Sequence, residues 1–360
     1  MTEKLSIAKI GLSRTDVGVL FALILGLCMV NKAVCRPRSQ AEPGLLEVPS
    51  PRTELKLQEL PFKIVYETYR ETNGKENREL FLINADGSKS VNLTNTADVD
   101  EMYPHASPDG TKICFVADEL IKNKKVRNVY YMNSDGTGRI KVAENARQPC
   151  WSPDGSAIAY VKGEFDRYTT TDYATKGLFI YDLESREHKE HQNRRLSHLY
   201  NICWSPDGKW VVATVHGAMG YKHTNLAIEV GGARVFDLAL RGCRPDVAPD
   251  GKKIVWCPDE KNLWTGDLDL ISPRPQVTNK RRVFKESGVD IYQQHADWSP
   301  GGNLIAFSRG PKEGGEGRYP VEPGNPAKGW NICVGNLAGE WVQITTDGNH
   351  NKEPDWVGQP

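Results

Sequence analysis

The sequence predicts an all-β protein: a six-bladed β-propeller of four-stranded blades, closed by pairing N- and C-terminal strands. Three observations predict it. A short turn motif of the Ser-Pro-Asp-Gly type recurs along the chain, apolar strands follow its copies, and the two chain ends hold complementary fragments of one unit. Recurrence of one supersecondary unit every ~40 to 50 residues is typical of propeller blades.

The turn motif occurs as ASPDG at 106–110, as WSPDG at 151–155 and 204–208, as APDG at 248–251, as WSPGG at 298–302 and, truncated, as PDWVG at 354–358. In such a turn proline fixes φ, aspartate tolerates the next position, and glycine takes the left-handed conformation that returns the chain. Successive turn prolines lie 45, 53, 43 and 51 residues apart, as expected for blades with loops of variable length.

Each complete unit holds further strands. Apolar strands are expected directly after the turns, at 112–116, 157–161, 210–214, 253–257 and 304–308. Strands that end in a polar turn are expected at 79–88, 128–137, 177–185 and 331–340, and short ones follow at 91–95 and 342–347. Together with the strand before the turn, this makes four strands per unit, the composition of a propeller blade.

The two chain ends complete the sixth blade. Residues 62–95 carry the later strands of a unit but lack its opening strand and turn, and residues 353–358 supply an opening strand with nothing after it. Joined, they form one blade and remove the free edges that a half blade would expose. The propeller is therefore predicted to span residues 62–360.

The N-terminal region differs from the rest. Lys4, Lys9 and Arg14 precede an apolar run at 17–30, which is shorter than the ~20 residues of a bilayer span and suits an export signal. Residues 1–35 are predicted to be a signal peptide or an N-terminal anchor, and residues 36–61 a Pro-rich linker. We expect a periplasmic or secreted protein, or one anchored to the inner membrane by this segment alone.

Composition restricts the partners. The 46 basic and 46 acidic residues cancel, so no net positive charge recruits nucleic acid. The eight cysteines include several that sit inside apolar runs or recur at one repeat position, which favours buried thiols over disulfides. We expect a monomer without a cofactor. The pair His188 and His191 lies in a charged segment and is expected to be solvated.

The SPDG turn, the strand IAFS at 305–308 and the strand YYMNSDGT at 130–137 resemble the TolB-like, WD-like propeller repeats of bacterial periplasmic proteins. The resemblance covers about residues 62–358. It implies a rigid extracytoplasmic propeller that binds other proteins, as TolB binds the peptidoglycan-associated lipoprotein and the Tol inner-membrane complex. Unlike TolB, this chain has only the short, Pro-rich segment 36–61 where an α/β domain would stand.

Alignment of the blades on the turn serine separates framework positions from candidate site positions. The residue before the serine is aromatic or apolar and is expected to pack between blades. The residues two and four places before it lie on the opposite side of the strand and are expected to ring one mouth of the central channel. The predicted ligand- or partner-binding residues are Tyr103, His105, Gln148, Asn201, Arg244, Asp246, His295, Asp297, Glu353 and Asp355.

These polar residues have two interpretations: a wet channel mouth that merely tolerates them, or a recognition surface, a small-ligand site or an ion site. Their spacing matches no recognised metal signature, and no metal ligands are assigned. The loop 216–225 contains two histidines, a tyrosine and a lysine as well as two glycines, and is either a second binding feature or a flexible hairpin.

The sequence contains neither a GxSxG nucleophile motif nor a phosphate-binding glycine loop. It therefore favours a non-catalytic binding or scaffold module of the cell envelope, with an envelope protein as its partner. The alternative is a sugar-binding propeller or a metal-assisted carbohydrate-active enzyme similar to oligogalacturonate lyases.

Overall fold

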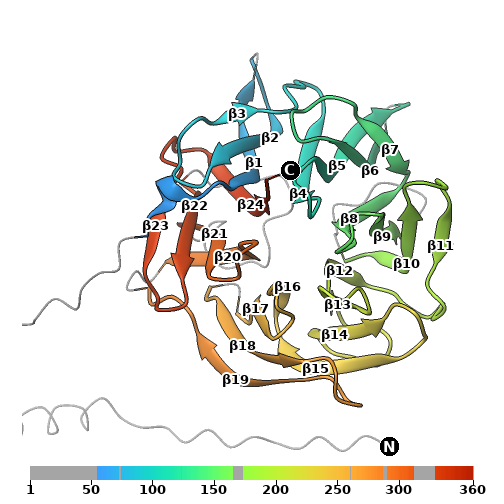
Figure 1. The fold of residues 1–360 in the computed structure, drawn as a ribbon. Coiled ribbons are helices and arrows are strands. Elements are labelled where there is room, and N and C mark those ends of the chain that lie inside the picture. Colours follow the sequence, from blue (N-terminus) through green and yellow to red (C-terminus); the bar gives the residue numbers. More distant parts are fainter. Residues whose placement is uncertain are drawn as a thin grey trace, which may run out of the picture. The chain divides into compact units, whose positions relative to one another are not determined.

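The computed structural model describes residues 55–359 except 73, 123, 165–172, 260, 287–289 and 312–328. The described residues form six four-stranded antiparallel sheets arranged in a ring, as predicted (Figure 1). The predicted signal or anchor segment and most of the predicted linker lie outside the described residues. Within the described part, no helix is long and apolar enough to cross a membrane.

The first three blades are built as follows. Blade 1 contains β24 (His350–Val357), β1 (Lys63–Thr72), β2 (Lys75–Asn84) and β3 (Val91–Asn92). Blade 2 contains β4 (Asp100–Ala106), β5 (Lys112–Ile121), β6 (Lys124–Asn133) and β7 (Ile140–Ala143). Blade 3 contains β8 (Ala146–Trp151), β9 (Ala157–Gly163), β10 (Thr175–Asp182) and β11 (His188–Glu190).

The other three blades follow the same order. Blade 4 contains β12 (Leu199–Trp204), β13 (Trp210–Val215), β14 (Thr224–Glu229) and β15 (Val235–Arg241). Blade 5 contains β16 (Cys243–Val247), β17 (Lys253–Cys257), β18 (Trp264–Asp269) and β19 (Gln276–Arg282). Blade 6 contains β20 (Ile291–Trp298), β21 (Leu304–Pro311), β22 (Asn331–Asn336) and β23 (Trp341–Gln343).

Blade 1 closes the ring with both chain ends, as the sequence predicted. β24 pairs antiparallel with β1, from Lys63 opposite Val357 to Tyr69 opposite His350. Figure 1 shows β24, in red, beside β1, in blue. A 3-10 turn at Leu57–Glu59 precedes β1, and Leu57 is buried in the same apolar cluster as Trp356.

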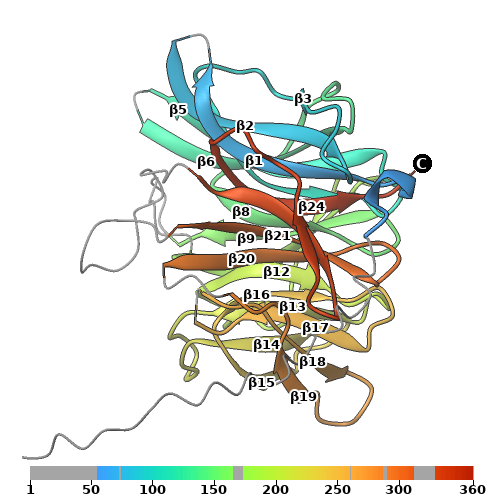
Figure 2. The ribbon, with the colours of Figure 1, turned by 90° about the vertical axis from the view of Figure 1, so that its left-hand side faces the viewer.

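The strands run along the axis of the ring, so their connections lie on two faces (Figure 2). We call the face where the innermost strands end the turn face, since the SPDG turns lie there, and the opposite face the loop face. In the turn after β8, the Ser152 hydroxyl donates to Asp154 at 2.6 Å and accepts the Ala157 N–H at 2.9 Å. Gly155 takes the left-handed conformation with φ 72°. The Ser, Asp and Gly of the motif therefore build the turn.

The position before the turn serine packs between blades, as expected. Trp151, Trp298 and Trp356 are buried in clusters with residues of the preceding blade, and Trp204 at the same position is partly buried. The six cysteines among the described residues are all buried: Cys114, Cys150, Cys203, Cys243, Cys257 and Cys333.

The expectation for His191 was wrong. Its side chain is buried, and Nε2 hydrogen-bonds the backbone oxygen of Glu229 at 2.8 Å, which joins blade 3 to blade 4. His188 is exposed, but its Nδ1 hydrogen-bonds the Tyr160 hydroxyl at 2.9 Å. The charged residues around His191 predicted exposure, but blade 4 covers its ring, and the local sequence contains no signal of that contact.

Candidate functional site

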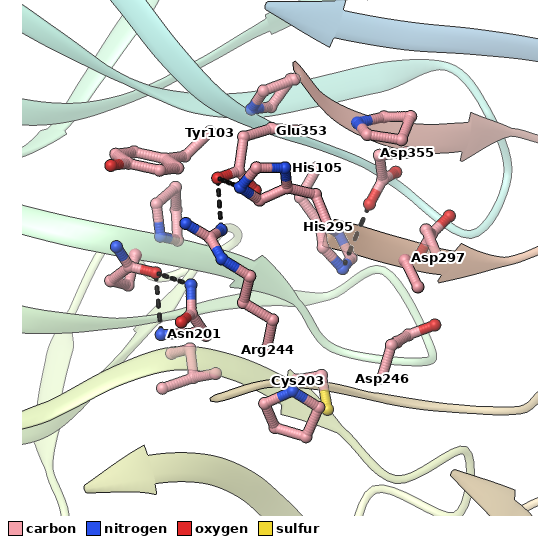
Figure 3. Close-up of a pocket in the computed structure, with 17 residues that line it drawn as sticks. Tyr103, His105, Asn201, Cys203, Arg244, Asp246, His295, Asp297, Glu353 and Asp355 are labelled. Carbon is pink, nitrogen blue, oxygen red and sulfur yellow. Dashed lines mark hydrogen bonds and ion pairs between the residues drawn. The ribbon is translucent and has the colours of Figure 1, made fainter. Parts of the chain in front are cut away.

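A cavity of about 100 Å³ lies in the channel between the six innermost strands (Figure 3). All six blades contribute to it. All ten residues predicted for the channel mouth line it, and Cys203 lines it too: Tyr103, His105, Gln148, Asn201, Arg244, Asp246, His295, Asp297, Glu353 and Asp355. The sequence alignment of the blades therefore brought together residues that do share one cavity.

The six residues four places before the turn serine share an unusual backbone conformation. All six have positive φ: Tyr103 (52°), Gln148 (56°), Asn201 (46°), Arg244 (59°), His295 (53°) and Glu353 (49°). The pairing register of each innermost strand shifts at this point, as at a β-bulge. Left-handed backbone costs about 1 kcal/mol or more for a residue with a Cβ, and glycine would avoid that cost. None of the six is glycine.

Arg244 and Glu353 form an ion pair across the channel from blades 5 and 1. His295 of blade 6 completes the group, with Nε2 3.1 Å from the same oxygen, Oε1 of Glu353 (Figure 3). Burial raises the pKa of Glu353 to about 7 although Arg244 opposes the shift. Burial, together with the positive charge of Arg244, lowers the pKa of His295 well below its usual value. His295 is therefore a neutral imidazole at neutral pH.

Gln148 and Asn201 form the second polar pair of the ring. The backbone N–H of Asn201 donates to Oε1 of Gln148 at 2.9 Å, which links blade 4 to blade 3. Three buried polar atoms of the ring have no hydrogen-bond partner among the described residues: Nε2 of Gln148, Oδ1 of Asn201 and Nδ1 of His295. Such atoms are rare in folded proteins and each calls for an explanation.

Three aspartates two places before the turn link neighbouring blades. The Asp246 carboxylate accepts the Trp298 N–H at 2.8 Å, and that of Asp297 accepts the Trp356 N–H at 2.8 Å. Asp355 accepts the Ala106 N–H at 2.7 Å. These links join blades 5, 6, 1 and 2 in succession.

Burial and mutual repulsion act against the negative charge of these aspartates. Burial, together with the neighbouring Asp355, raises the pKa of Asp246 to about 7. Burial and the two flanking carboxylates raise the pKa of Asp297 well above its usual value. The aspartate row, formed by Asp246, Asp297 and Asp355, therefore still holds protons at a pH where isolated aspartates are fully ionised.

His105 of blade 2 stands at the position that the aspartates occupy in their blades, two places before the turn serine. Its Nε2 lies 3.4 Å from the Cys150 sulfur and 3.8 Å from Oδ2 of Asp355. Burial lowers the pKa of His105, but Asp355 and the Cys150 thiol outweigh this and raise it well above its usual value. The imidazolium form therefore sits beside the aspartate row.

Among the residues that the structure describes, no group of three or more His, Cys, Asp and Glu side chains is arranged to hold a metal ion. The predicted site residues omitted Cys203, which lines the cavity from the position two places before Ser205, and the sequence did not predict the left-handed backbone. One signal was present: proline follows Tyr103, Gln148, Arg244 and Glu353 directly. Proline cannot donate to a sheet ladder and is confined to edges and bulges, so its recurrence marks an irregular strand.

A second, wider groove of about 520 Å³ lies between β7 of blade 2 and the sheet of blade 3. Its wall includes the stacked rings of Tyr160 and Phe179, whose centroids are 5.5 Å apart. Tyr160 is buried, and the rim mixes charges of both signs from Lys162, Glu190 and Arg194. No backbone strain of the kind found in the channel marks this groove.

No family model and no curated protein sequence matches the chain. Solved structures do. TolB from Acinetobacter baumannii is 18% identical, with a TM-score of 0.60 over 82% of this chain and 66% of TolB. Hydrazine synthase from Kuenenia stuttgartiensis is 12% identical, with a TM-score of 0.57 over 82% of this chain and 46% of that one. A chain of a nidogen/laminin complex is 8% identical, with a TM-score of 0.55 over 83% of this chain and 100% of that one.

The chain thus spans less than two thirds of the first two of these proteins. Identities this low show a shared fold and no more. The repeated turn, the six blades and the structural likeness agree: this protein is a six-bladed β-propeller with a TolB-like fold.

Proposed function

We propose that this protein is an exported, non-catalytic propeller of the cell envelope that binds a protein partner at the channel mouth. One observation carries the proposal. In each of the six blades, a residue other than glycine takes the left-handed backbone conformation, and all six of these residues line the same cavity. Strain of this kind persists where the side chains are needed, and it clusters at functional sites. A purely structural bulge would be served better by glycine.

The size of the cavity favours a protein partner over an oligosaccharide. Small-molecule sites usually occupy about 300 to 1,000 Å³, and this cavity measures about 100 Å³. Such a space accepts one or two side chains that project from a partner. Arg244 and Glu353 offer both charges to such a side chain, and the unpartnered amide atoms of Gln148 and Asn201 offer a donor and an acceptor.

The structural neighbours support a binding role. One of them is a chain of a nidogen/laminin complex, which makes it a propeller-like chain that was solved together with another protein. The likeness to TolB and the basic and apolar N-terminal segment support export to the periplasm. An envelope protein is the partner class that this location provides.

Affinity capture from envelope extract tests the partner site. Tagged parent protein is compared with the double variant Arg244→Ala/His295→Ala and with Gln148→Ala, which removes no charge. Lys209→Ala, on the exposed turn face, is the matched control. We expect one stoichiometric partner that both channel variants lose and the control retains, with circular dichroism showing that all proteins are folded. Retention of the partner by folded channel variants would contradict the proposed site.

A catalytic role is tested directly. Purified protein with added Mn²⁺ or Ca²⁺ is incubated with oligogalacturonate, and unsaturated uronides are followed by ultraviolet absorbance. We expect no product above the rate without protein. Steady product formation that is lost in His295→Ala would replace the binding role with the carbohydrate-active alternative.

Cell fractionation tests export. We expect the full chain in the periplasmic fraction or with the inner membrane, and a chain without residues 2–35 in the cytoplasm. An unchanged distribution would show that the N-terminal segment is not an export signal.

A further inference from the structure

Three histidines and two tyrosines gather on the loop face beside the channel. We define the His–Tyr cluster by its members: Tyr173, His198, Tyr200, His216 and His223. Tyr173 precedes β10 of blade 3, and the other four lie in or beside β12 and the loop between β13 and β14 of blade 4. Tyr200 directly precedes Asn201 of the channel ring. The cluster therefore connects blades 3 and 4, and one of its members is the sequence neighbour of a residue that lines the cavity.

The loop at 216–223 is held down by its two histidines. The His216 ring stacks on Tyr173, with centroids 3.9 Å apart and planes 19° apart. Nε2 of His223 hydrogen-bonds the Tyr200 hydroxyl at 2.7 Å. Between these anchors the loop turns through Gly217, Met219 and Gly220, all with positive φ. Ala218, Met219 and Tyr221 of the loop also pack against the apolar core around blade 4, so removal of the two ring contacts would weaken the attachment of the loop without abolishing it.

Positive charge on both rings would oppose this arrangement. The rings of His216 and His223 have centroids 5.2 Å apart, so two imidazolium charges would repel each other strongly. Among the residues that the structure describes, the carboxylate of Glu164 lies beside the cluster and is paired with His198, whose Nε2 lies 3.4 Å from Oε2. The described titratable and charged groups that face the two rings are Tyr173, His198 and Glu164 from one side, and Tyr200, Arg241 and the loop's own Lys222 from the other.

We propose that the 216–223 loop is a pH-responsive flap, closed on the His–Tyr cluster when His216 and His223 are neutral and released when both are protonated. Burial and the nearby His198 lower the pKa of His216 below its ordinary 6.5. Burial, His216 and Arg241 lower the pKa of His223 in the same direction. For a histidine with a lowered pKa, the stabilisation of the closed form is complete above pH 6.5 and is lost as the pH falls below it.

Hydrogen exchange of the full chain tests the flap. Exchange of the 216–223 peptide is measured at pH 7.5 and pH 5.5 and corrected for the intrinsic pH dependence of amide exchange. We expect it to speed up by about threefold or more at the lower pH, since protonation shifts the opening equilibrium. The 230–234 turn of the same blade holds no histidine and serves as the internal control.

The matched variant is His216→Phe/His223→Gln. Phenylalanine keeps a ring against Tyr173, and glutamine keeps a hydrogen-bond partner for Tyr200, but neither side chain takes up a proton. We expect the variant loop to exchange at the same corrected rate at both pH values. A parent loop without pH dependence, or a variant that retains it, would overturn the proposal.

A second measurement serves in case the variant does not fold. The imidazole C–H resonances of the parent protein are followed by NMR between pH 8 and pH 4. We expect His216 and His223 to titrate below 6.5. Titration of both at or above 6.5 would show that the closed loop does not disfavour their charge, and would overturn the proposal.

Discussion

The carboxylate of Asp246 in blade 5 accepts a hydrogen bond of 2.8 Å from the backbone N–H of Trp298 in blade 6. This carboxylate is the first of three, from Asp246, Asp297 and Asp355, that follow one another around the channel and whose charge is disfavoured there. The link between blades thus depends on an acceptor oxygen, whereas the charge on that oxygen is unfavourable. These two contributions can be separated by substitution.

Asp246→Asn is expected to stabilise the protein at pH 8 by about 1 to 3 kcal/mol and to have little effect at pH 4. Asparagine keeps an acceptor for Trp298 and removes the charge. Because burial raises the pKa of Asp246 from 3.8 to about 7, its favourable protonated form is present below pH 4 and is lost as the pH rises through 7. Urea unfolding at both pH values measures the difference.

Asp207→Asn is the control for this experiment. Although burial opposes it, hydrogen bonds from Ser205 and Lys209 lower the pKa of Asp207, so its charge is favourable. This variant is expected to gain no stability at pH 8. A gain equal to that of Asp246→Asn would mean that the effect does not come from the buried row.

Glycine is expected to be more stable than alanine at the left-handed positions. For Gln148 both substitutions delete the same amide, so the difference between them reports only on the Cβ in left-handed backbone. We expect Gln148→Gly to exceed Gln148→Ala in unfolding free energy by about 1 kcal/mol. Thr278 is exposed on strand β19 and its own φ is not positive, so it should show the opposite order by about 0.5 to 1 kcal/mol. If the glycine and alanine variants had the same order of unfolding free energy at both sites, the proposed backbone strain at Gln148 would be contradicted.

Removal of Arg244 is expected to cost more than removal of the whole ion pair. Arg244→Met leaves Glu353 buried without its cation, which costs about 3 to 5 kcal/mol. The double variant Arg244→Met/Glu353→Gln is expected to recover most of that loss, since it leaves no isolated charge. Unfolding free energies of the parent, both single variants and the double variant form a complete cycle. Additive losses would show that the two side chains do not interact.

Deletion of residues 352–360 is expected to cause a large loss of stability. It removes the part of β24 that pairs Lys63 with Val357 and Val65 with Asp355, and with it the link from Asp355 to Ala106. A melting temperature more than about 10 °C lower is expected, or no cooperative unfolding at all. Deletion of residues 359–360 alone spares β24 and is the control. A melting point within about 2 °C of the parent for the longer deletion would contradict closure by β24.

The fold was predictable because the turn motif repeats. Proline, aspartate and glycine form each turn through local interactions, so the motif alone predicts the turn. Side chains alternate between the two faces of a strand, which then determines the residues that face the channel. Contacts between blades were not predictable in this way. The pair of Arg244 and Glu353, and the stacking of His216 on Tyr173, depend on how neighbouring sheets pack, which the order of residues along one strand does not encode.

The pairing of Lys63 with Val357 also determines when the protein can fold. These partners lie at opposite ends of the chain, so the contact has one of the largest sequence separations possible here. Entropy opposes the closing of so long a loop until the intervening blades have formed. Among the described strands β24 is synthesised last, so blade 1 cannot be completed before the strands of the other five blades have been made.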